Sequence, residues 1–268
     1  MELLGAEFFQ RALIGGALIA VTVPLMGLFL VLRRLAMIGD ALSHVSIAGV
    51  ALGFLAGIYP IAAGLLFAVV ASIGIEKLRR TYRTYAELSL AIIMAGGIAL
   101  ASILFTSGKG FNLNVSAYLF GSIYTLDAAD LWVIAAITVV VLGAILSHRK
   151  ELFLLAFDED GAAVRGLPVR YFNLLISILT ALVITAAIKI VGALLVSALL
   201  TIPAAISLAL SRSFRQSVVL VVAAGEFAVL AGLWIAGIWN LAPGGTVVLL
   251  LICMLMLALA ARSRLPRW

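Results

Sequence analysis

The stretch that decides the fold is GDALSHVSIAGVALGFLAG, residues 39–57. It is apolar enough to span a membrane, yet it carries Asp40 and His44, which lie one turn apart on the same face of a helix. A carboxylate in hydrocarbon is costly unless it is paired or faces water. We therefore expect a polar pathway or a bound cation here, with mutual capping at a cytoplasmic helix end as the alternative. Small residues recur at every fourth position and predict close approach of a second helix: Gly49, Gly53 and Gly57.

The composition extends this expectation to the whole chain. Its 268 residues are 65% hydrophobic and 11% charged, with a mean hydropathy of +1.26. A soluble domain does not bury so much apolar surface, so we expect an all-α polytopic membrane protein with one transmembrane domain, 1–268. The single cysteine, Cys253, excludes an intrachain disulfide and a thiolate metal cage. The net charge of +6 does not indicate nucleic acid, because the charges fall in loops.

About nine transmembrane helices are expected, with eight as the alternative, at roughly 20 residues per span. The third and the last segments are short, and the sixth and seventh are almost continuous. Pro203 predicts a kink or a break in the seventh segment. The segments are 12–32, 36–56, 61–76, 88–106, 131–147, 172–190, 192–210, 217–238 and 246–261.

The basic residues predict the orientation of these helices. Of the 18 lysines and arginines, 15 follow the first, third, fifth, seventh or ninth segment. The exceptions are Arg11, Lys109 and Lys189. Cytoplasmic loops carry the excess of positive charge, so we expect the N-terminus outside and the C-terminus in the cytoplasm.

Two long loops interrupt the series. The second half of the outer loop, 107–130, is aromatic and amphipathic, and predicts a short re-entrant or interfacial helix. In the inner loop, 148–171, acidic residues 158–160 and the later Gly166 and Pro168 delimit a short cytoplasmic helix. That helix is either a docking element for a partner or a solvated connector.

Two charged side chains lie within or beside predicted spans. Lys189 is at the outer end of the sixth span, where it is expected to extend toward the interface. Glu226 lies in the middle of the eighth span, and its role stays open. No G-x-x-x-x-G-K-[ST] phosphate loop occurs, so ATP hydrolysis by this chain in that manner is not expected.

Four motifs, in order, resemble the permease subunits of zinc and manganese ABC uptake transporters, the ABC-3 family. The resemblance runs from about Arg33 to Pro243. Residues 42–54 and 87–101 look closer to the zinc permeases than to those for manganese or iron. The motifs are GDALSHVSIAGVALG, SAYLFGSI, FDEDGAAVRGLPV and KIVGALLVSALLTIPAA, which start at residues 39, 116, 157 and 189.

This resemblance implies a type II importer-like fold in the cell membrane of a prokaryote. It also implies a homodimer, cytoplasmic ATP-binding subunits, and an extracytoplasmic solute-binding protein that delivers the metal. Asp40 and His44 match the family's metal-contacting pair, and no permanently bound cofactor is expected beside the transported Zn²⁺ or Mn²⁺. Lys189 matches a family lysine whose role stays open. The ATPase-coupling residues are expected in the helix 158–167: Asp158, Glu159, Asp160, Ala163 and Gly166.

Imidazole nitrogen and carboxylate oxygen both bind Zn²⁺, and two copies of the chain would supply an N₂O₂ set. The expected function is therefore zinc import, with a manganese or iron permease as the first alternative and a vitamin B12 or siderophore permease as the second. A secondary carrier would show inverted repeats, which are not evident in the sequence. An intramembrane metalloenzyme would need a motif such as H-E-x-x-H, which is absent.

Overall fold

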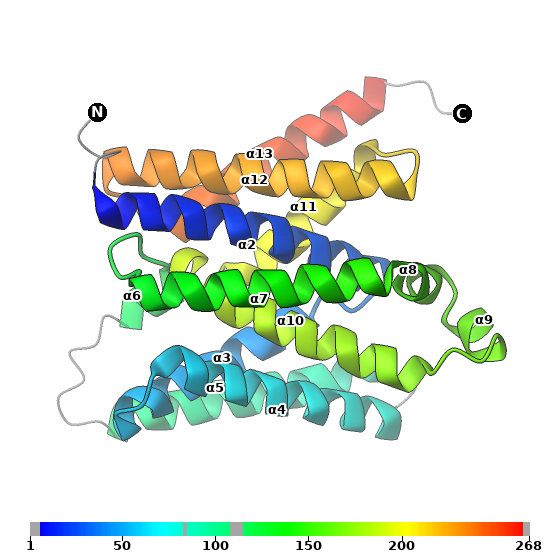
Figure 1. Cartoon of the computed structure of the whole chain (residues 1–268), viewed down its shortest axis with the longest axis horizontal. Coiled ribbons are helices and arrows are strands. Elements are labelled where there is room, and N and C mark those ends of the chain that lie inside the picture. The colour runs from blue at the N-terminus through cyan, green and yellow to red at the C-terminus, as the bar shows by residue number, and fades with distance from the viewer. Residues whose placement is uncertain (1–5, 83–84, 108–114, 265–268) are drawn as a thin grey trace.

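The computed structural model describes residues 6–82, 85–107 and 115–264, and all the secondary structure in these ranges is helical. Long helices lie roughly side by side in a bundle (Figure 1). The helices are α2 (Glu7–Leu32), α3 (Ile38–Ala56), α4 (Pro60–Thr81), α5 (Ala86–Ser107), α6 (Val115–Phe120), α7 (Ala128–Ser147), α8 (Arg149–Phe157), α9 (Glu159–Val164), α10 (Val169–Val191), α11 (Val196–Leu210), α12 (Phe214–Trp239) and α13 (Pro243–Arg264).

Eight of the described helices are long and apolar enough to cross a membrane, and α11 is a shorter apolar helix. Each coincides with one of the nine predicted segments. The short segment is the seventh, because residues 192–195 form a turn before α11 begins. The third and ninth helices are full length, contrary to the prediction. Of the two alternatives at Pro203, a kink or a break, the break does not occur, because α11 continues through that residue.

The two ends of the bundle carry different short helices (Figure 1). Helix α2 begins at the end with α6, and helix α13 ends at the end with α8 and α9. We call these the outer and inner ends, following the orientation that the basic residues predict. The outer loop forms the expected short helix at α6, while its residues 108–114 lie outside the described part of the chain. The inner loop holds α8 in addition to the expected short helix α9.

The central helices are α2, α3 and α10, most of whose residues are buried. Close backbone contacts explain the density of glycine. A Cβ on Gly27 of α2 would lie 1.8 Å from the carbonyl oxygen of Leu200 in α11. In lipid, where hydrophobic association between helices is weak, such close packing stabilises the bundle.

Candidate functional site

Asp40 and His44 lie at the inner end of α3, one turn apart, as the sequence predicts. Both side chains are half-buried. Within the described residues, neither side chain forms a hydrogen bond or an ion pair, so the mutual capping given as the alternative is not seen. Among the described residues, the pair is therefore a carboxylate and an imidazole without a hydrogen-bond or ion-pair partner inside an apolar bundle.

The opposite face of α3 packs against α4 through the predicted glycine spacing. A Cβ on Gly49 would lie 2.6 Å from the carbonyl oxygen of Ala63, and one on Gly53 would lie 2.8 Å from Cα of Pro60. Gly57 serves another purpose, because it ends α3 with φ of 66° and has open space around it. The first two glycines hold α3 against α4, with Asp40 and His44 directed away from that contact.

Two serines beside the pair already have hydrogen-bond partners. The Ser43 hydroxyl donates to the carbonyl oxygen of Gly39, 2.7 Å away. The Ser46 hydroxyl lies 3.3 Å from that of Thr185 and joins α3 to α10. In the described chain, no three histidine, cysteine, aspartate or glutamate side chains gather where they could hold a metal ion. One copy therefore supplies at most part of a coordination shell.

A cavity of about 370 Å³ opens beside the inner end of α3. Met37 lies three residues before Asp40 and on the same helix face, and it lines this cavity together with a stripe of α5. The α5 stripe consists of Glu87, Leu90, Ala91 and Met94. The face that carries Asp40 thus borders a hollow with one carboxylate, which sequence reasoning did not single out.

At the outer end, the interpretation of Lys189 as a side chain that extends toward the interface is wrong. Lys189 is only 8% exposed, and its ammonium group pairs with the fully buried Asp130 carboxylate. The Tyr59 hydroxyl and the backbone N–H of Asp127 also donate to Asp130. Asp130 lies 59 residues before Lys189, at the start of α7, so no local pattern revealed the pair. The D-x-x-D capping pattern at 127–130 was the available signal.

Two tyrosines, Tyr59 and Tyr118, lie near this ion pair. Burial, followed by the charges of Asp130 and Asp127, raises the pKa of Tyr118 to about 12. Burial and the hydrogen bond to Asp130 raise the pKa of Tyr59 above its ordinary value. The outer cluster therefore holds one ammonium and two carboxylates beside two neutral phenols.

The predicted coupling residues lie together at the inner end but have different roles. The Asp158 side chain caps α9 by accepting from the backbone N–H of Gly161, 2.8 Å away. Asp160 and Ala163 are exposed. Gly166 ends the helix with φ of 80°, a conformation that favours glycine. Glu159 instead contacts another part of the protein.

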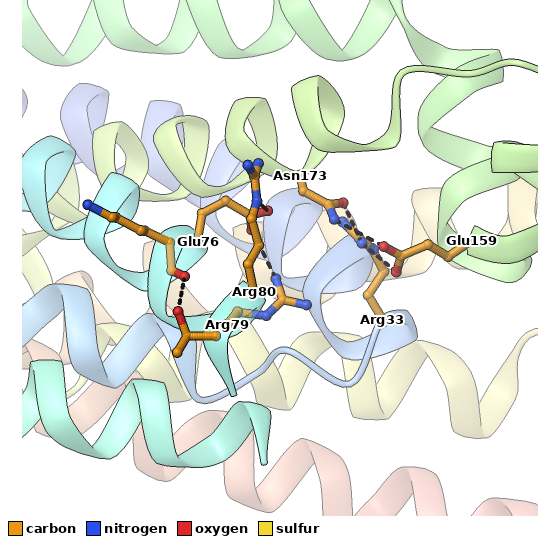
Figure 2. A network of polar contacts seen from close by, with 8 residues as sticks. Arg33, Glu76, Arg79, Arg80, Glu159 and Asn173 are labelled. Atoms are coloured by element: carbon orange, nitrogen blue, oxygen red, sulfur yellow. Dashed lines mark hydrogen bonds and ion pairs between the residues drawn. The ribbon is translucent and has the colours of Figure 1, made fainter. Parts of the chain in front are cut away.

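Glu159 contacts two residues that sequence reasoning did not assign to the site. Figure 2 shows Arg33 and Asn173 directed toward it. The Arg33 guanidinium donates to Glu159 at 3.0 Å and to Asn173 at 2.7 Å, and the Asn173 amide donates to Glu159 at 3.0 Å. Glu76, Arg79 and Arg80 form a second group beside them (Figure 2). No sequence pattern connects positions 33, 159 and 173.

These observations define a class of protein. The apolar helices identify a multi-pass membrane protein, and the polar pair on an open face of a central helix indicates transport. The chain belongs to the ABC 3 transport family, whose sequence pattern matches residues 5–262. It is therefore a membrane component of a metal ABC transport system.

Individual relatives support this membership. A Treponema pallidum protein named probable metal transport system membrane protein is 36% identical, over 94% of this chain and 95% of its own length. The manganese import system permease protein ScaB of Streptococcus gordonii is 32% identical, over 91% and 87%. The structure of PsaBC from Streptococcus pneumoniae in complex with Fab superposes with a TM-score of 0.85 at 28% identity, over 96% of this chain and 92% of that one.

Proposed function

We propose that this chain is the permease subunit of an ABC importer that carries a divalent transition metal, manganese before the others, into the cytoplasm. The observation that carries the proposal is the pair Asp40 and His44, a carboxylate and an imidazole without other partners in the described structure, on the open face of a central helix. Both are metal ligands, and an intramembrane ionisable residue is a functional candidate by default.

Manganese replaces zinc as the first candidate. The zinc expectation rested on the resemblance of two sequence stretches to zinc permeases, whereas the Streptococcus gordonii relative is named a manganese permease. The ligands themselves accept both ions, because carboxylate suits Mn²⁺ and imidazole suits Zn²⁺. A mixed site binds zinc more tightly than manganese, so zinc should compete for the site whichever ion is carried.

A homodimer would complete the metal site. One chain offers two ligands, and two chains related by a two-fold axis would offer two carboxylates and two imidazoles. Mn²⁺ prefers six ligands, so water or backbone oxygen would supply the rest. A shell shared between two chains also provides a means of release, since separating the α3 helices would halve the ligand set.

A separate ATPase would dock on α9. This helix is exposed at the inner end, and its Val164 side chain is 89% exposed. Phe157, just before α9, is also exposed, so two apolar side chains are available for a partner. A solute-binding protein would deliver the metal at the outer end, and lipid would cover the apolar outer helices.

Uptake of radioactive manganese tests the proposal. Cells that lack their own manganese importer would express the chain with its ATPase and solute-binding protein. We expect uptake by the wild type and a loss of at least tenfold in Asp40→Asn and in His44→Ala. Glu226→Gln is the matched control, because it removes a half-buried acidic group elsewhere in the membrane and should keep uptake within twofold.

The pattern of competition separates the candidate metals. Uptake of manganese that survives an equal concentration of iron supports manganese as the substrate. Zinc uptake with no manganese uptake would restore the zinc expectation. Transport of either metal that both variants retain would keep the importer and reject Asp40 and His44 as its ligands.

A further inference from the structure

Arg33, Glu159 and Asn173 form a closed ring of hydrogen bonds that joins three elements at the inner end (Figure 2). Arg33 ends α2, Glu159 is the first residue of α9, and Asn173 lies in the first turns of α10. The Arg33 side chain is only 3% exposed, while that of Glu159 is 45% exposed. The ring therefore joins an exposed helix to the buried core.

The ring is charged at neutral pH. Burial lowers the pKa of Arg33, and the nearby Glu159 carboxylate opposes that effect. Burial pushes the pKa of Glu159 upward, but the hydrogen bonds and charge supplied by Asn173 and Arg33 outweigh it and leave that pKa below its usual value. Hydrogen bonds between charged partners are about twice as strong as neutral ones. A displacement of Glu159 would thus draw Arg33 with it.

The segment between Arg33 and Asp40 is short and conformationally restricted. Arg34 adopts φ of 57°, and the Leu35 N–H donates back to the carbonyl oxygen of Leu30 at 2.8 Å, which closes a tight corner. Helix α3 begins at Ile38, so Asp40 already lies in its first turn. Movement of Arg33 therefore shifts the start of α3.

The corner is also packed against the core. Leu35 and Ile38 are buried, and a Cβ on Gly39 would lie 2.8 Å from a methyl group of Leu200. Such packing has few intermediate arrangements, so a displacement of the corner should move it as a unit. Asn173 gives a second route, because α10 contacts α3 through Thr185 and Ser46.

We propose that Arg33 and Glu159 are positioning residues that transmit displacement of α9 to Asp40 and His44 at the start of α3. This proposal rests on the proposed function, in which α9 receives the ATPase and the pair receives the metal. The ring assigns the transmission to one charged contact between α9 and the α2–α3 corner.

The test measures metal uptake and ATP hydrolysis together in proteoliposomes that contain the full chain and its ATPase and are supplied with its solute-binding protein. The variants are Glu159→Ala, Arg33→Ala and the double variant, with Glu159→Gln as the conservative substitution. We expect each alanine variant to move at least fivefold less Mn²⁺ per ATP, while ATP hydrolysis stays within twofold. The double variant should be no worse than the worse single variant, because the contact is already lost. Glu159→Gln keeps a hydrogen-bond acceptor, so its Mn²⁺ uptake per ATP should fall between that of the wild type and that of Glu159→Ala.

Glu151→Ala is the matched control, since it removes an acidic group of α8 at the same end of the bundle, outside the predicted coupling helix, and leaves the ring intact. This control should move as much Mn²⁺ per ATP hydrolysed as the wild type. A wild-type ratio in both single alanine variants would overturn this proposal alone. Equal losses of uptake, hydrolysis and melting temperature would overturn it as well, since they indicate a merely structural contact. Hydrolysis without Mn²⁺ uptake by the wild type would overturn the proposed function, and this proposal with it.

Discussion

Lys189 and Asp130 form a buried ion pair that joins the end of α10 to the start of α7. Within the described part of the chain, Asp130 accepts three donors, from Lys189, from Tyr59 and from the backbone of Asp127. A buried charge is stable only when its hydrogen-bonding capacity is used in this way. The outer end of the bundle is therefore held by polar contacts among elements that are distant in sequence.

Lys189→Met should destabilise the protein, because it leaves the Asp130 carboxylate buried with one charged partner removed. Loss of one partner of a buried pair costs about 3–5 kcal/mol. We expect the melting temperature of the purified protein in detergent to fall by several degrees. The control is Arg11→Gln, which breaks the exposed pair between Arg11 and Glu7 and should cost at most about 1 kcal/mol. Equal effects of the two variants would show that the buried pair contributes little.

The phenols near this pair predict a sensitivity to alkali. Their pKa values are raised in the folded protein, so their contribution to stability is complete below the ordinary value and is lost as the pH rises through the folded value. For Tyr118 that loss begins near the ordinary pKa of 10.0 and is complete by about pH 12. When the absorbance of tyrosinate is followed as the pH is raised, the wild type should show an ionisation step near pH 12 that Tyr118→Phe removes. A late step of the same size in the variant would contradict the assignment.

Two glycines at the outer end have no tolerated replacement. Gly121 and Gly192 adopt φ of 81° and 89°, and the turns that contain them approach so closely that a Cβ on Gly121 would lie 2.2 Å from a backbone oxygen of Ile190. Alanine at either position combines an unfavourable φ, costing roughly 1–2 kcal/mol, with a backbone collision. We expect low yield and a reduced melting temperature. Gly143→Ala, in open space within α7, is the control and should be neutral or slightly stabilising.

The helices were predictable because a membrane imposes a strict length and composition on each span. The nine segments, the pair on α3 and the short helix α9 follow from such local rules. The partners of Lys189 and Glu159 were not predictable, because Asp130 and Arg33 lie 59 and 126 residues away and only the packing of helices brings them together. The short α11 was missed for a different reason, since hydropathy does not register the turn at Gly192.

The cavity beside α3 provides the last prediction. Among the described residues that line it, Glu87 is the one carboxylate, and Met37 connects the cavity wall to the helix face that carries Asp40. If the metal leaves the pair toward the inner end, it passes this hollow, and a carboxylate there lowers the cost of a partly dehydrated cation. Glu87→Gln should therefore reduce the maximal rate of Mn²⁺ uptake about threefold to tenfold and leave the concentration for half-maximal uptake within twofold.

The expected split between rate and affinity distinguishes an exit path from a binding site. A variant of the metal-binding pair, such as Asp40→Asn, should lose uptake at every Mn²⁺ concentration, whereas Glu87→Gln should lose only the maximal rate. Glu87→Asp is the matched control, because it keeps the charge in the cavity and should retain most of the rate. Unchanged kinetics in Glu87→Gln would place the release path away from this cavity, since a carboxylate on the path cannot be neutralised without altering the electrostatic free energy of the passing cation.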